Sequence, residues 1–308
     1  MSEVSSNNLA IENGELLKLA IFERKGLNGL WLKLLGFLFT LLDHIGLIFQ
    51  AQIGQLAYTI LRSTGRCAFP IFVFLAIEGV YHTRNYWKYF LRLIVIAVVL
   101  DAFCYGVYYG SNGTLGAQLT PGNVFTDLAL GTLVIYLFRR NDPWTMLSLL
   151  PIAYLVLSDF TIYRHGSLSP YAIIPAGIAS DYGTYGITMF ILIYFGYQLA
   201  FKYQRYRAKQ IGISASDMPG SSMRITLNGF ASGAILLTGC IFQIIAWIGF
   251  TGIEPGIGWA VESWSMLAVI PILLYDGRPG VTNRPVRYSL YLFYPAHLIL
   301  LWCISLAF

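Results

Sequence analysis

Nine apolar segments, each close to the length that a helix needs to cross a bilayer, constrain this chain more than any other feature. They cover residues 28–49, 66–83, 88–109, 122–139, 143–159, 185–201, 225–250, 259–275 and 287–307. About 20 apolar residues span the hydrocarbon layer as a helix, and helices satisfy their own backbone hydrogen bonds there. The composition agrees, because 56% of the residues are hydrophobic and only 11% are charged. We therefore predict an all-α fold: a polytopic integral membrane helical bundle with about nine spanning helices.

Lysine and arginine are distributed unevenly between the loops that join these segments. If the N-terminus lies in the cytoplasm and the segments alternate, all but three of the 20 basic residues fall on the cytoplasmic side. The three exceptions are Arg62, Arg66 and Arg164. Because cytoplasmic loops retain basic residues, this pattern predicts a cytoplasmic N-terminus and a multi-pass membrane protein.

Two further stretches contain apolar residues without the length or purity of a span. Residues 168–180 are too short and contain two prolines, so we predict a short re-entrant segment there. Residues 9–26 mix apolar and charged residues, as in a helix that lies on the membrane surface. We expect a cytoplasmic or interfacial N-terminal segment, 1–27, and a single transmembrane domain, 28–308.

Ionisable and strongly polar side chains inside the spans are candidates for function, because they are costly in lipid. Those that share an outer-to-middle depth are Asp43, His44, Arg66, Asp101, Asn123, Asp127 and His297, while Glu78 and Glu262 lie nearer to span ends. We predict that the first group lines one polar cavity. The alternative is a set of separate buried ion pairs that lock helices together.

Other functional classes find no support in the sequence. Glu78 and His82 are four residues apart on one helical face, but two ligands are too few for a metal site. No metalloprotease, phosphate-loop, serine-hydrolase or dinucleotide-binding motif is present. We expect no metal and no nucleic-acid partner, since the membrane topology accounts for the basic residues.

Several short blocks of this sequence resemble the TraX family. They are LLDHIG (41–46), GRCAFPIFVFLAIEG (65–79), YHTRN (81–85), NVFTDLALG (123–131), YDGRPG (275–280) and YLFYPAH (291–297). The blocks occur in order from about residue 33 to the C-terminus. TraX proteins are associated with N-terminal acetylation of conjugative pilin in the inner membrane of bacteria, and they are similar to multi-span membrane acyltransferases. The resemblance therefore implies a multi-pass protein of the bacterial inner membrane.

The resemblance implies an acyltransferase that moves an acetyl group from cytoplasmic acetyl-CoA to an acceptor near the outer face. The acceptor would be a pilin N-terminus or an envelope glycan. His44 would be the general base, and Asp43, Arg66 and His297 would orient it or polarise the thioester. The remaining assignments are Asn123, Asp127, Glu78 and Asp101 for substrate binding, and Lys33, Arg84, Lys88, Arg139 and Arg140 for the phosphates of acetyl-CoA.

Two other functions stay open at this stage. Intramembrane Asp and His residues also form proton relays, so a transporter or proton-coupled permease would fit. The chain could also be a noncatalytic partner in pilus or envelope assembly, whose polar groups only join helices. Membrane lipids are expected partners in every case.

Overall fold

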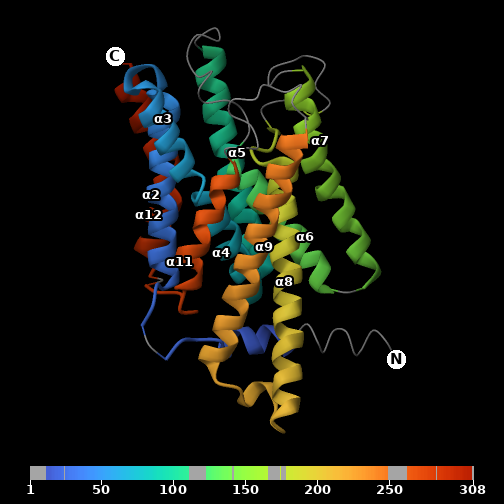
Figure 1. Cartoon of the computed structure of the whole chain (residues 1–308). Helices are drawn as coiled ribbons and strands as arrows, with labels where there is room; N and C mark the ends of the chain where they lie inside the picture. Colours follow the sequence, from blue (N-terminus) through green and yellow to red (C-terminus); the bar gives the residue numbers. More distant parts are fainter. Residues whose placement is uncertain are drawn as a thin grey trace. The chain divides into compact units, whose positions relative to one another are not determined.

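The computed structural model describes residues 12–23, 25–110, 123–140, 142–165, 174, 178–248, 262–281 and 283–306. These residues form helices without any extended strand, apart from an isolated bridge between Leu27 and Tyr275. The α-helices are α2 (Gly29–Ile48), α3 (Gln50–Gly65), α4 (Ala68–His82), α5 (Tyr86–Gly110), α6 (Val124–Arg140), α7 (Leu149–His165), α8 (Gly183–Gln210), α9 (Gly220–Ile248), α11 (Val269–Leu273) and α12 (Arg284–Ser305) (Figure 1). Three 3₁₀ helices join them: η1 (Pro143–Ser148), η3 (Ala215–Asp217) and η4 (Ser263–Ala268). The predicted all-α class is confirmed.

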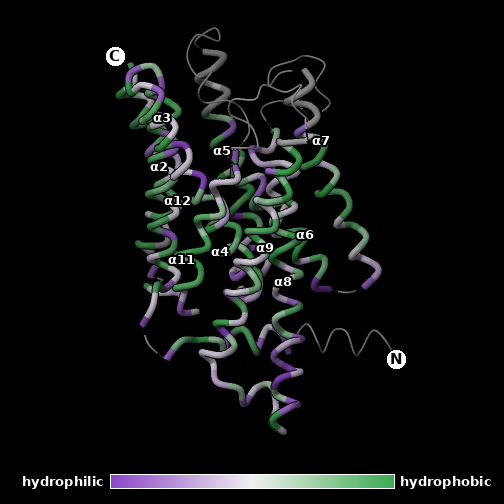
Figure 2. Tube along the Cα trace, in the orientation of Figure 1, coloured by the Kyte–Doolittle hydropathy of each residue, from purple (hydrophilic) through white to green (hydrophobic). Residues whose placement is uncertain are grey.

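Five of the described helical stretches are long and apolar enough to cross a membrane. They are Gly29–Ile48, Gln50–His82, Gly183–Gln210, Gly220–Ala246 and Tyr288–Ser305. Figure 2 shows hydrophobic residues along much of these helices, with hydrophilic residues near the Gln210 end of α8. The chain is thus a membrane protein with several spans, and the number nine stays a prediction.

The predicted segments and the helices differ in two places. Each predicted segment contains a helix, but in the described part of 259–275 the helical stretch Ser263–Leu273, made of η4 and α11, is shorter than a span. Helix α3 was not predicted, because its polar residues lower the hydropathy between α2 and α4. The predicted re-entrant segment, 168–180, lies outside the described residues except for 174 and 178–180.

Asparagine residues begin four of the described helices. The side chain of Asn28 accepts hydrogen bonds from the backbone N–H groups of Leu30 and Trp31 at the start of α2. Asn85, Asn123 and Asn283 cap α5, α6 and α12 in the same way. Since the first N–H groups of a helix have no partner within it, these caps fix where each helix begins.

The chain divides into two compact units, and each is considered by itself. The first unit comprises Met1–Ala10 and Ala76–Ile191, and the second comprises Ile11–Leu75 and Leu192–Phe308. Helices α4 and α8 each contribute to both units.

The N-terminal segment packs on protein within the second unit. Residues 12–19 are helical, and the side chains of Leu16 and Leu17 are buried. The backbone N–H of Phe22 donates to the carbonyl of Asp276, and the buried Arg224 donates to that of Ala20. Part of the apolar face predicted for the membrane surface is therefore covered by the protein.

Candidate functional site

Two histidines predicted as site residues meet inside the second unit. His44 lies in the last part of α2 and His297 in the middle of α12, and these helices pack against each other. The Nδ1 atom of His44 is 2.7 Å from the Nε2 atom of His297. We call these two residues the histidine pair.

The hydrogen bonds of the histidine pair determine which nitrogen carries each proton. The Nδ1 atom of His297 is 3.0 Å from the carbonyl oxygen of Phe293, which can only accept, so Nδ1 of His297 is the donor. In the neutral ring, Nε2 of His297 is then an acceptor, and Nδ1 of His44 must donate to it. This leaves the lone pair on Nε2 of His44, and no described residue forms a hydrogen bond with that atom.

Aromatic rings hold the histidine pair in place. Phe293 stacks on His297 with ring centroids 5.0 Å apart, and Tyr294 presents its edge to both imidazoles. The ring centroids of Phe37 in α2 and Phe293 in α12 are 4.5 Å apart. This contact joins the two helices about one to two helical turns away from the histidine pair. Pro295, inside α12, removes one backbone N–H just before His297. His297 is buried and His44 is half-buried.

Beside the histidine pair lies a set of four charged residues that we call the ion-pair cluster: Asp43, Arg62, Arg66 and Glu262. The carboxylate of Asp43 accepts from Arg62 at 2.5 Å and lies 3.5 Å from Arg66. Arg66 also pairs with Glu262 at 2.9 Å. Two positive and two negative charges thus neutralise each other, as buried charges require.

The cluster changes the role predicted for Asp43. Its carboxylate faces Arg62 and Arg66, and it makes no hydrogen bond with His44. Neighbouring residues of a helix point about 100° apart, so His44 turns to α12 while Asp43 turns to α3. The residue that orients His44 is therefore His297.

Glycine permits the contact between α2 and α3. A Cβ atom at Gly65 would lie 2.7 Å from both the Cα and the Oδ1 atoms of Asp43. That is closer than real Cβ contacts, so only glycine lets this end of α3 approach Asp43. Arg62 and Arg66 flank Gly65 and reach the carboxylate because of it.

Sequence reasoning did not assign Arg62 to the site, although a signal was present. Arg62 and Arg66 are two of the three basic residues that fall outside the cytoplasmic segments. They are also four residues apart, the spacing of one helical face. Glu262 was noted as an intramembrane charge but received no role.

The predicted polar residues Asp101, Asn123 and Asp127 lie in the first unit, where Asn123 and Asp127 form hydrogen bonds with backbone groups. Asn123 donates to Asp101 at 2.7 Å and caps α6. Asp127 accepts from the Ser180 hydroxyl at 2.6 Å and from three successive backbone N–H groups at residues 181–183. Asp127 thereby caps the start of α8, and its two oxygens are already occupied. The prediction that these residues share one cavity with His44 stays a prediction.

Glu78 and His82 face each other on the last turn of α4. The His82 Nδ1 atom lies 3.7 Å from the Glu78 carboxylate and 2.8 Å from the Glu78 carbonyl oxygen. Glu78 is buried and His82 is exposed. Over the described part of the chain, no group of three or more His, Cys, Asp or Glu residues could hold a metal ion.

The basic residues predicted for acetyl-CoA have different surroundings. Arg84 and Lys88 are exposed and form no ion pair with a described residue. Arg139 donates to the carbonyl of Val80 and lies 4.1 Å above the Tyr81 ring, and Arg140 pairs with Asp142 at 2.8 Å. Lys33 lies half-buried in α2, in the second unit.

Comparison with known proteins gives one family and one relative. A family model described as "TraX protein" matches residues 28–305. The relative is "Probable fimbrial assembly protein FimC, serogroup H1" from Dichelobacter nodosus, which is 26% identical over 276 residues. This alignment covers 88% of the present chain and 92% of the relative. No solved structure matches the chain significantly.

Proposed function

The chain belongs to the TraX protein family, and from this premise we propose that it is an inner-membrane acyltransferase with His44 as its general base. Membership confirms the resemblance inferred from the sequence blocks. Similarity to a fimbrial assembly protein supports a role in fimbrial or pilus assembly. The acceptor on this proposal is a pilin N-terminus or an envelope glycan.

The observation that carries the proposal is the hydrogen bond between the histidine pair. It places the proton of His44 on Nδ1 and leaves a basic lone pair on Nε2. A general base needs such a lone pair together with a fixed ring orientation. The Phe293 carbonyl and the His297 ring together supply the orientation that an aspartate supplies in a Ser-His-Asp triad.

Bound acetyl-CoA would supply an acetyl thioester, which an acceptor amine or hydroxyl attacks while the bond from carbon to sulfur breaks. Nε2 of His44 takes the proton from the attacking atom and can return it to the leaving thiolate. While His44 is positively charged, Nε2 of His297 continues to accept from Nδ1 of His44. The nearby positive charges of Arg62 and Arg66 are balanced by Asp43 and Glu262.

Among the basic residues of the first unit that the sequence predicts for acetyl-CoA, Arg84 and Lys88 have no described partner that would compete with a phosphate, and their role in binding it stays a prediction. Their side chains are exposed and unpaired among the described residues. Charged hydrogen bonds to phosphate need donors of this kind. Arg139 instead contacts Tyr81 and Val80, and Arg140 contacts Asp142. We expect these two arginines to stabilise the packing of α4 and α6.

The experiment is acyl transfer by the full-length protein in lipid nanodiscs, with radiolabelled acetyl-CoA and either a fimbrial subunit or a membrane glycan. We expect His44→Ala to lower the rate by about 10²–10⁴-fold, the usual contribution of a general base. His82→Ala is the matched control, because His82 is exposed and lies outside the histidine pair. Full transfer by a correctly inserted His44→Ala protein would contradict the proposal.

A noncatalytic assembly role is the second candidate, and the ion-pair cluster favours it. Asp43, Arg62, Arg66 and Glu262 join α2, α3 and the start of η4, and such pairs serve structure without chemistry. In that case His44→Ala would impair fimbrial assembly only through lower stability. Uptake of a substrate into proteoliposomes without acyl donor would instead support a transporter.

A further inference from the structure

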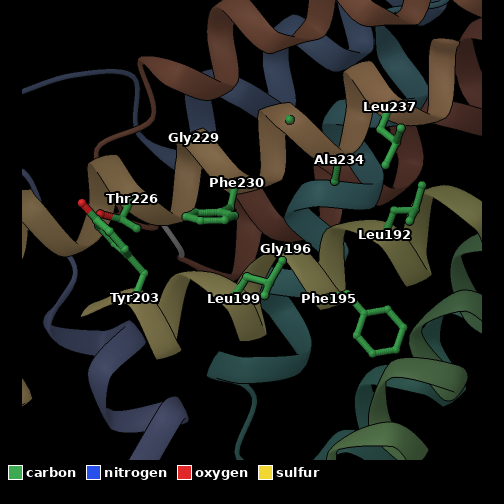
Figure 3. A pocket seen from close by; sticks show the side chains of 11 residues that line it. Leu192, Phe195, Gly196, Leu199, Tyr203, Thr226, Gly229, Phe230, Ala234 and Leu237 are labelled. Atoms are coloured by element: carbon green, nitrogen blue, oxygen red, sulfur yellow. The ribbon is translucent and has the colours of Figure 1, made fainter. Parts of the chain in front are cut away.

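An apolar groove of about 610 Å³ runs between α8 and α9, entirely within the second unit. Figure 3 shows Tyr203 and Thr226 at one end of the groove and Leu192 and Leu237 at the other. We propose that this groove binds one acyl chain of an anionic phospholipid, whose phosphate lies against Arg207 at the Tyr203 end. This site is separate from the histidine pair.

The length of the groove matches one leaflet of a bilayer. Leu192 and Tyr203 are eleven residues apart on α8, which is about 17 Å along a helix. Thr226 and Leu237 have the same separation on α9. Half of the hydrocarbon thickness is about 15 Å, so the groove accommodates a chain that enters from one side and ends near the midplane.

The groove exists because side chains are missing from its floor. A Cβ atom at Gly229 or Gly233 would meet nothing within 4 Å. Behind them, a Cβ at Gly196 would lie 3.0 Å from the carbonyl oxygen of Phe230, so α8 and α9 are in close contact there. Glycines thus open a narrow channel along two closely packed helices.

The shape of the groove favours a lipid chain over a second membrane helix. A crossing helix packs best where small residues continue along its path. Here Gly229 and Gly233 are followed on the same face of α9 by the exposed and bulky Leu237 and Ile244. An acyl chain needs only the open stretch.

The charge at the Tyr203 end is complementary to an anionic headgroup. The guanidinium of Arg207 lies 6.0 Å from the centre of the Tyr203 ring. Lys202 and Lys209 are exposed on the same end of α8, and no described carboxylate pairs with them. Arg205, by contrast, is paired with Glu12. Basic residues at this level attract anionic phospholipids.

The test uses full-length protein in nanodiscs that contain phosphatidylglycerol or phosphatidylcholine, each with a photoreactive group on one acyl chain. We expect phosphatidylglycerol to label peptides from 192–203 and 226–237 in preference to phosphatidylcholine. Gly233→Leu should abolish this labelling by filling the channel. Arg207→Ala should reduce the preference for phosphatidylglycerol about fivefold, the effect of one basic residue near an anionic surface.

Gly106→Leu is the matched control, since Gly106 is a helical glycine of α5 that also has nothing within 4 Å of an added Cβ. It should leave labelling unchanged. Competition of unlabelled lipids on the wild-type protein gives a second measurement that needs no variant. Equal competition by both lipids, or labelling that survives in Gly233→Leu, would overturn the proposal. Cross-linking of two copies through 226–237 would also overturn it, because a second copy would then occupy the groove.

Discussion

The Nδ1 atom of His44 lies 2.7 Å from the Nε2 atom of His297, although the two residues are 253 positions apart in the chain. The Nδ1 atom of His297 donates to the Phe293 carbonyl. The Nε2 atom of His297 is therefore the acceptor in the hydrogen bond between the two histidines, and Nδ1 of His44 is the donor. This relationship makes His44, and not His297, the residue with a free basic nitrogen.

Replacement of His297 should lower transfer without abolishing acetyl-CoA binding. His297→Ala removes the acceptor of a charge-assisted hydrogen bond, so we expect kcat to fall about 10–100-fold with little change in KM. His297→Gln places an amide oxygen where Nε2 was and should recover part of kcat. A purely structural role would lower the folded fraction in both variants and leave kcat per folded molecule unchanged.

Nitrogen NMR should detect the predicted tautomers directly. In protein labelled with ¹⁵N-histidine, we expect the proton of neutral His44 on Nδ1 and that of neutral His297 on Nδ1 as well. His297→Gln identifies the signals of His297 by their disappearance. A proton found on Nε2 of neutral His44 would contradict the assignment of this residue as the base.

The ion-pair cluster should be more sensitive to single than to double replacement. Arg62→Met removes the guanidinium that lies 2.5 Å from the Asp43 carboxylate. We expect the free energy of unfolding to fall by about 3–5 kcal/mol. The cluster then holds two carboxylates and one guanidinium, so adding Asp43→Leu removes the excess negative charge and should restore most of that loss. Thermal unfolding in detergent measures both, with the exposed Arg92→Met as control. Additive losses would show that the two residues do not interact.

Gly65→Ala should separate α3 from α2. The new methyl group would meet Asp43 at less than van der Waals distance, and such overpacking costs about 1–3 kcal/mol. Gly106→Ala, in open space on α5, should be neutral or stabilising because alanine favours helix. Thermal unfolding of the two variants distinguishes these outcomes. Equal stability of both would mean that α3 approaches Asp43 less closely than described.

Asp127 should prove to be a capping residue rather than a substrate ligand. Asp127→Ala removes the acceptor for Ser180 and for the N–H groups of residues 181–183. We expect stability to fall by about 2 kcal/mol or more, while KM for the acceptor is unchanged. Asp217→Ala, at the exposed end of η3, is the control. A raised KM with unchanged stability would restore the substrate-binding role predicted from the sequence.

The sequence by itself determined the all-α class of fold and singled out the two histidines as candidates. Apolar segments of membrane length predict helices directly, since few other backbone structures satisfy their hydrogen bonds in lipid. A histidine or aspartate in such a segment is a functional candidate because burying it in lipid costs free energy.

Only the tertiary structure decided which polar groups meet. Hydropathy gives depth along a helix but not the direction in which a side chain points. The partner of His44 therefore became known only from the packing of α2 against α12, and that of Asp43 only from the packing of α2 against α3. Asp127 looked like a buried charge with a function, because the backbone that it caps lies more than fifty residues further along the chain. Packing between distant helices depends on side-chain fit, which no local pattern records.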